Sequence, residues 1–353
     1  MSKFIDSRLG ALEEYVPGEQ PRDKKYIKLN TNEFPYPPAP GVIAAVSAAE
    51  VADLRLYSDP TCKALKEKLA ARYEVTPENV FVGNGSDEVL NFAFAAYCRG
   101  GAAFPDISYG FYPVFAELYG IDSEIIPLNE DLSIDPAQYC SKGKAVVIAN
   151  PNAPTGLCMP VGAIERIVKT NPDNVVIVDE AYVDFGGESA TALTKKYENL
   201  LVVGTFSKSR ALAGARVGFG IGDCALIRDL EKIKYCTNPY NINRLSLVAA
   251  EAALDARAYY DEKDALVAET REKAQADLRA LGFAATESKA NFIFAKHAKL
   301  PGAALYEALK ARGILVRHFT VPRIRDWNRI TVGTPEEMKT LIENIKEILN
   351  GLE

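Results

Sequence analysis

The sequence predicts an α/β protein with a large domain on a mostly parallel sheet and a smaller α+β domain. The chain of 353 residues exceeds one compact hydrophobic core, which favours two domains. From about residue 79 to residue 225, short Val- and Ile-rich runs alternate with helical stretches, which is the pattern of a mostly parallel sheet. From residue 291 onward a shorter alternation of strands and helices indicates the smaller domain.

The chain is expected to begin with an arm and a stiff connector. Residues 1–30 have little apolar content for a core of their own, and we assign them to an N-terminal arm. Prolines crowd the next segment and predict an extended connector, at Pro35, Pro37, Pro38 and Pro40. Residues 61–73 place Leu65 and Leu69 at helical spacing with lysines on the other face, which predicts an amphipathic helix.

The later elements suggest where the domains divide. A charged helix of bridging type is predicted over residues 259–281. Strands are predicted over residues 291–295, 314–317 and 329–332, and helices over residues 302–312 and 335–349. We therefore assign residues 31–270 to the large domain. Residues 271–353 form the small C-terminal domain, which we expect to pack with the N-terminal segment.

The composition of the chain agrees with a soluble enzyme. A net charge of −6 argues against nucleic acid and anionic membranes as main partners. The first residues lack the apolar core of a signal peptide, and no long apolar run could span a bilayer. No cysteine pair has the C-x-x-C spacing, so we expect no metal site and reduced thiols in the cytoplasm. The cysteines are Cys62, Cys98, Cys140, Cys158, Cys224 and Cys236.

Polar side chains follow successive predicted strands in the middle of the chain. Asn152 lies in a turn after one apolar run, and Asp179 ends the next. Lys208 follows the apolar residues 200–204, and Arg216 comes eight residues later. Because ligands of parallel sheets bind at the carboxyl ends of the strands, we expect these four groups to meet at one edge. An amide, a carboxylate, an amine and a guanidinium are the groups that pyridoxal 5′-phosphate requires.

Each reactive part of that cofactor has a candidate partner. The aldehyde needs an amine, which Lys208 would supply, and this lysine would also act as the catalytic base. Asp179 would keep the ring nitrogen protonated, so that the ring can accept electrons. Asn152 and Tyr182 could both hydrogen-bond the phenolic oxygen. Tyr109 could stack on the face of the pyridine ring.

The phosphate has two candidate cradles. One is the guanidinium of Arg216 with a hydroxyl from Ser207 or Ser209, because a guanidinium fork matches phosphate oxygens. The other is a Gly-rich turn that opens a helix and presents backbone N–H groups, at Gly85, Ser86 and Asp87.

Each residue also has an ordinary structural interpretation. Lys208 alone could be a solvated surface lysine, and Asp179 could cap a helix. Ser86 with Glu88 could do the same, and Asn152 could serve its turn. Tyr109 and Tyr182 could be half-buried aromatic residues. The order of the motifs, each after a Val- or Ile-rich strand, favours the cofactor site.

These motifs resemble the fold type I, aspartate-aminotransferase-like enzymes that use pyridoxal phosphate, and most closely the histidinol-phosphate aminotransferase family. The resemblance covers nearly the whole chain. It is carried by residues 29–38, 57–60, 83–88, 150–156, 179–182, 207–218 and 329–334. Two departures are Ala153, where many relatives have asparagine, and the residues 209–211 after the lysine.

The tail of the sequence carries candidate substrate contacts. Arg317 and Arg329 lie on predicted strands and could clamp anions, although either could instead make a surface ion pair. The resemblance implies that Arg329 binds a substrate carboxylate or phosphate and that Arg317 adds a phosphate contact. Residues of the N-terminal arm would close over the substrate: Tyr15, Asn30 and Glu33. Tyr57 resembles a residue that reaches the cofactor phosphate of a neighbouring subunit, which implies a homodimer with shared sites.

The resemblance implies a transamination in histidine biosynthesis. L-histidinol phosphate and 2-oxoglutarate would give imidazole acetol phosphate and glutamate, with Lys208, Asp179 and Tyr182 as the catalytic residues. Three alternatives remain open at this point. The chain could be an aromatic amino acid aminotransferase, a threonine-phosphate decarboxylase, or a ligand sensor without activity.

Overall fold

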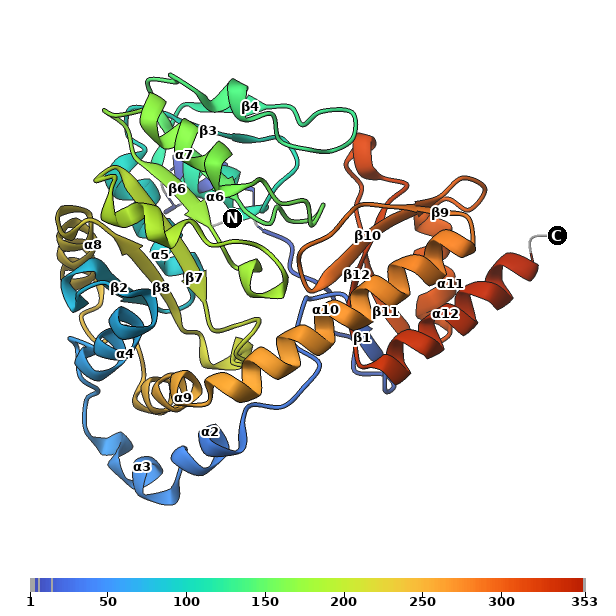
Figure 1. Cartoon of the computed structure of the whole chain (residues 1–353), viewed down its shortest axis with the longest axis horizontal. Coiled ribbons are helices and arrows are strands. Elements are labelled where there is room, and N and C mark those ends of the chain that lie inside the picture. The colour runs from blue at the N-terminus through green and yellow to red at the C-terminus, as the bar shows by residue number, and fades with distance from the viewer. Residues whose placement is uncertain (1–3, 6, 14, 352–353) are drawn as a thin grey trace.

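The computed structural model describes residues 4–5, 7–13 and 15–351. It contains a seven-stranded and a five-stranded sheet, which lie on opposite sides of the molecule in Figure 1. The long helix α10 (Arg257–Ala280) extends from beside α9 (Arg244–Asp255) to the small sheet. Across the described part of the chain, no helix combines the length and apolar character needed to cross a bilayer.

The large sheet is parallel except for one strand. Strand β8 runs antiparallel to both of its neighbours, β2 and β7, and the other pairs are parallel. In sheet order the strands are β2 (Val80–Gly83), β8 (Gly218–Gly222), β7 (Leu200–Thr205), β6 (Val176–Asp179), β5 (Ala145–Ala149), β3 (Ala102–Pro105) and β4 (Ser123–Ile126). The predicted mostly parallel sheet is therefore confirmed.

Helices cover both faces of the large sheet. Successive strand residues point to opposite faces, so Val147 of β5 packs in one apolar cluster while Val146 and Ile148 pack in another. The first cluster includes residues of α5, α6 and α8, and the second includes residues of α7. The helices on this side of the molecule are α9 and also α2 (Pro40–Ala45), α3 (Ala48–Ala52), α4 (Lys63–Tyr73), α5 (Ser86–Tyr97), α6 (Phe111–Tyr119), α7 (Val161–Thr170) and α8 (Cys224–Thr237).

The small sheet combines one strand from the N-terminal part of the chain with four strands from the C-terminal part. Strand β1 (Ile27–Leu29) pairs in parallel with β11 (Ile314–His318), so part of the predicted arm belongs to a sheet. The remaining strands are β12 (Asn328–Thr331), β10 (Phe292–His297) and β9 (Phe283–Ala285), and all of their pairings are antiparallel. Helices α10, α11 (Gly302–Ala311) and α12 (Pro335–Asn350) lie with this sheet, and the short α1 spans Ser7–Gly10.

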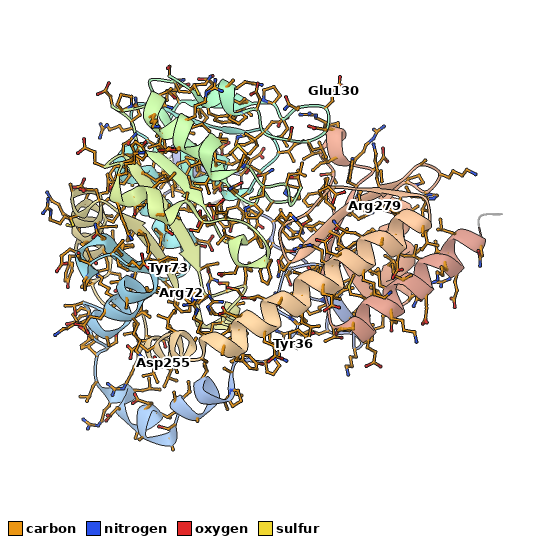
Figure 2. All side chains as sticks on the ribbon, in the orientation of Figure 1. Tyr36, Arg72, Tyr73, Glu130, Asp255 and Arg279 are labelled. Carbon is orange, nitrogen blue, oxygen red and sulfur yellow. The ribbon has the colours of Figure 1, made fainter. Side chains whose placement is uncertain are left out.

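Helix α10 contacts both parts of the molecule. Near its start, Asp264 accepts from Arg210 Nη1, in the loop after β7, at 3.2 Å. Beside it Lys263 Nζ lies 5.3 Å from the ring centroid of Tyr36, and near the helix end Arg279 donates to the carbonyl of Ala285 in β9. Figure 2 labels Tyr36 and Arg279 at these two places. The domain boundary assigned at residue 270 falls within this helix and stays a prediction. Pro40 does not extend the proline connector, because it begins α2, where a missing N–H costs no helical hydrogen bond.

Candidate active site

Three neighbouring parallel strands deliver the predicted residues to one edge of the large sheet. Ala149 at the end of β5 pairs with Asp179 at the end of β6, which pairs with Val203 of β7. The loops that follow these strands therefore leave the sheet together. They enclose a cavity of about 180 Å³ whose polar lining includes Ser86, Asp87, Tyr109, Asp179, Tyr182, Ser207, Lys208 and Arg216.

Lys208 lies where this cavity meets a second one. It lines both the smaller cavity and an adjoining space of about 450 Å³, and its Nζ is 5.7 Å from the ring centroid of Tyr182. Its loop is held by local hydrogen bonds, since the Ser207 amide donates to Thr205 Oγ1 at 3.1 Å and the Ala211 amide to the Lys208 carbonyl at 3.0 Å. The loop backbone is thus fixed, and the Lys208 side chain lies between the two cavities.

Asp179 is a buried carboxylate that makes no direct ion pair with any of the described residues. The Tyr112 hydroxyl donates to its Oδ2 at 3.0 Å, and the Ala181 amide donates to its Oδ1 at 3.2 Å. Burial raises the pKa of Asp179 to about 6 against the opposing effect of these hydrogen bonds. A protonated ring nitrogen in the cavity would supply the missing positive charge.

The start of α5 presents backbone N–H groups to the cavity, where the sequence analysis predicts an anion site. Gly85 has φ 79°, and a side chain there would lie 2.4 Å from the Arg216 guanidinium. A side-chain carbon at Gly218 would lie 2.2 Å from the backbone nitrogen of Ser86, so β8 can pass under this turn only as glycine. The first N–H groups of a helix have no intrahelical acceptor and suit a phosphate.

Asp87 links the side chains that surround the start of α5. Its carboxylate accepts from Arg216 Nη2 at 2.9 Å and from the Tyr109 hydroxyl at 2.7 Å. Arg216 also donates to Ser207 Oγ at 3.4 Å, which brings the two predicted cradles together. The side chain of Ser209 lies elsewhere, because it donates to Asp184.

Asn152 is buried and is hydrogen-bonded both within its own turn and to residues 107–108. Its Nδ2 donates to the Ile107 carbonyl at 3.0 Å and to Thr155 Oγ1 at 3.2 Å, while its Oδ1 accepts from Ser108 Oγ at 2.8 Å. It does not line the smaller cavity, whereas Ala153 does. The structure shows the turn role of Asn152, and its contact with a cofactor stays a prediction.

Two guanidinium groups face the larger cavity without an acidic partner. Arg329 donates to the Asn30 carbonyl at 3.1 Å, and Arg317 donates to the carbonyls of Val16 and Pro17 at 3.1 and 3.2 Å. Neither pairs with an acid among the described residues, and burial lowers the pKa of Arg329. By contrast, Arg323 is neutralised by Asp106 at 3.0 Å.

The arm residues differ in their distance from this cavity. Tyr15 and Asn30 line it, and the Tyr15 ring stacks on Phe111 with centroids 4.3 Å apart. Glu33 is not part of the lining, because its carboxylate pairs with Lys28 at 2.9 Å on the surface. The structure therefore does not bring Glu33 to the site. Asn32 lies there instead, although the sequence analysis did not select it.

Tyr57 is remote from both cavities within its own chain. Its side chain is 81% exposed, and its ring stacks on Tyr240 with centroids 4.4 Å apart. It lines neither cavity. The expected contact of Tyr57 with the cofactor of a neighbouring subunit stays a prediction.

Comparison with known families settles the relationship of the chain. The model of the family "Aminotransferase class I and II" matches residues 24–345. The chain belongs to the class I and II aminotransferases. It is 52% identical to the histidinol-phosphate aminotransferase of Marinomonas sp. (strain MWYL1), over 99% of this chain and 100% of that protein.

Solved structures confirm the aminotransferase fold. Histidinol-phosphate aminotransferase from Sinorhizobium meliloti, in complex with pyridoxal-5′-phosphate, superposes with a TM-score of 0.89 at 22% identity, covering 100% and 99% of the two chains. A Thermus thermophilus aspartate aminotransferase mutant gives a TM-score of 0.82 at 20% identity, covering 98% and 100%. The predicted aspartate-aminotransferase-like architecture and family membership are both confirmed.

Two residues of the site escaped the sequence analysis of this aminotransferase. Tyr112 is three residues after Tyr109 in the same aromatic segment, and it reaches Asp179 from inside α6. Asn32 donates from Nδ2 to the Tyr182 hydroxyl oxygen at 2.9 Å. The available signals were a second tyrosine near the predicted one and an asparagine between two selected positions, and neither specifies a contact.

Proposed function

We propose that this aminotransferase transfers the amino group of L-histidinol phosphate to 2-oxoglutarate, giving imidazole acetol phosphate and glutamate. The observation that carries the proposal is the pair of guanidinium groups, Arg317 and Arg329, in the cavity that also contains Lys208. Both substrates are anions, and an unpaired guanidinium binds carboxylate and phosphate oxygens well. The name of the Marinomonas relative supports the same reaction.

The cofactor is pyridoxal 5′-phosphate, and the residues of the smaller cavity fit it. Asp179 offers a buried carboxylate for the ring nitrogen, and the Gly85–Ser86 turn with Arg216 offers an anion site at the other end. Lys208 lies between them and beside the substrate cavity. When bound, this cofactor supplies an aldehyde that captures amines and a ring that accepts electrons.

The side chains would then divide the chemistry. Lys208 Nζ would hold the aldehyde of the cofactor, and as a free amine it would remove the proton from the substrate Cα. Asp179 would keep a proton on the ring nitrogen, and Tyr109 and Tyr182, which line the same cavity, would hold the ring. Arg329 and Arg317 orient the anionic ends of the substrate, so that its Cα faces Lys208.

A homodimer with shared active sites is part of the proposal. Exposed apolar side chains lie on the segment that carries Tyr57, which is unusual for a surface facing water. They are Ile43, Val51, Leu54 and Leu56, with the Tyr57–Tyr240 stack beside them. A two-fold contact between copies would cover this segment and bring the partner's Tyr57 toward the cofactor phosphate. We also propose a cytoplasmic location, in keeping with six unpaired cysteines.

Turnover of a small substrate panel tests the function. The purified protein loaded with pyridoxal phosphate should show its highest kcat/KM with histidinol phosphate and 2-oxoglutarate. Phenylalanine and tyrosine test the aromatic aminotransferase alternative, and carbon dioxide release from threonine phosphate tests the decarboxylase. A higher kcat/KM with any of these three would overturn the assignment, and no turnover of any substrate would favour the sensor alternative.

A further inference from the structure

Asn32 is a buried connection between Tyr182 and the small sheet. Its exposed fraction is 1%, and it has φ 55°, a left-handed conformation that asparagine tolerates better than most residues. Its backbone amide donates to Thr331 Oγ1 at 2.9 Å, and its carbonyl accepts from Asn291 Nδ2 at 3.0 Å. These contacts fix the backbone of Asn32, and its side chain extends to Tyr182 in the active site.

The hydrogen bonds of Asn32 define the direction of its side-chain amide. The Thr331 hydroxyl accepts from the Asn32 backbone N–H, so it can give its single hydrogen to Asn32 Oδ1, 3.1 Å away. This leaves Nδ2 facing the Tyr182 oxygen at 2.9 Å. The reversed amide would leave the Thr331 hydrogen without an acceptor among the described residues. The amide is therefore a donor to Tyr182.

A donor at this position determines what the Tyr182 hydroxyl can do. Because its oxygen already accepts from Asn32, the O–H of Tyr182 must point elsewhere, and no protein acceptor for it lies within the described chain. The ring is held edge-on against Phe292, with centroids 5.0 Å apart. Tyr182 lines both cavities, so its hydrogen is available to a ligand.

We propose that Asn32 is a positioning residue that holds Tyr182 as a hydrogen-bond donor to the phenolic oxygen of the cofactor. The inference rests on the proposed cofactor, and it extends to substrate recognition. Thr331 lies two residues after Arg329 on β12, so both side chains leave the same face of that strand. Asn32 thereby connects strand β12, which carries Arg329, to Tyr182.

The test is the pH titration of the visible absorption band of the enzyme loaded with pyridoxal phosphate. A donor to the phenolic oxygen stabilises its negative charge and lowers the midpoint of this titration. Asn32→Asp keeps the size, the left-handed preference and an acceptor for Thr331, but its carboxylate would take the Tyr182 hydrogen. We expect its midpoint to rise by about one pH unit or more, the scale of a hydrogen bond to a charged atom. Asn32→Gly should raise it less.

A double-mutant cycle with Tyr182→Phe separates positioning from a general structural effect. With phenylalanine at residue 182, Asn32→Asp should shift the midpoint by less than half as much, and Asn32→Gly should not shift it. Equal shifts in both backgrounds would overturn the proposal, as would unchanged midpoints in the single variants. Thermal melting of each apoenzyme verifies that the variants are folded.

The same experiment distinguishes this inference from the proposed reaction. If the wild-type enzyme shows the titrating band but does not convert histidinol phosphate, the substrate assignment is refuted. The double-mutant cycle of Asn32 and Tyr182 then still tests the role of Asn32. A wild-type protein without any band at saturating pyridoxal phosphate would refute the cofactor and the role of Asn32 together.

Discussion

Replacing Tyr112 by Phe should weaken cofactor binding in a way that depends on pH. The substitution removes one hydroxyl from a buried site, where it donates to Asp179 at 3.0 Å, and retains the aromatic ring. A hydrogen bond to a charged group contributes about 1.5–3 kcal/mol, and about 1.4 kcal/mol corresponds to one pKa unit. The pKa of Asp179 in the apoenzyme, already raised to about 6, should therefore rise by roughly one to two further units.

The sign of the effect follows from linkage. Asp179 must be ionised to pair with a protonated ring nitrogen, so affinity falls as the pH drops through the pKa of the apoenzyme and is independent of Asp179 well above it. The ratio of the variant Kd to the wild-type Kd should be near one at about pH 9 and roughly 2- to 10-fold at about pH 7, and should increase further below about pH 6.

Fluorescence titration of the apoenzyme with pyridoxal phosphate across this pH range measures the ratio. Tyr119→Phe is a matched control, because Tyr119 ends the same helix and its hydroxyl donates to Asn91 on the surface. The control should not change the Kd at any pH. A Tyr112→Phe ratio that does not vary with pH would refute the argument, since it would show that Tyr112 does not act through the charge of Asp179.

Three further predictions concern the cofactor, the substrate and the assembly. Borohydride reduction of the loaded enzyme should attach the cofactor to Lys208, and peptide mapping to another lysine would contradict the assignment. Arg329→Ala should raise KM about tenfold or more for both half-reactions. Arg317→Ala should raise KM more for histidinol phosphate than for glutamate, and equal effects would exclude a phosphate-selective role. Lys208→Ala and Tyr57→Ala subunits, each inactive alone, should regain activity after verified exchange; no rescue would place Tyr57 within its own chain.

The sequence was most informative where strands end in polar residues. Asp179 and Lys208 could be placed together because the apolar runs before them predict neighbouring parallel strands, whose carboxyl ends share an edge. Arg317 and Arg329 lie on strands, as predicted, and the structure adds that these strands pair and place the two residues opposite each other. These placements follow from local periodicity and one topological rule.

The contacts between sequence-distant loops could not be predicted in the same way. Whether Asn30, Asn32 or Glu33 faces the cavity depends on how the segment after β1 lies against β12, and no local pattern encodes that packing. Tyr112 is similar, because its place on α6 is periodic but its partner Asp179 comes from β6. The exposure of Tyr57 in the single chain does not show whether a second subunit covers it.

The pairing of β1 with β11 has a consequence for how the protein is made. Residues 27–29 leave the ribosome early, yet their hydrogen-bonding partners at residues 314–316 are synthesised near the end. Closing such a distant contact costs chain entropy before it yields any stabilisation, and contacts of this kind slow folding. The large sheet can form while synthesis continues. The larger cavity, which is lined by both Tyr15 and Arg317, can form only after the last strands have been made. The nascent chain would therefore carry its cofactor cavity before it can hold a substrate.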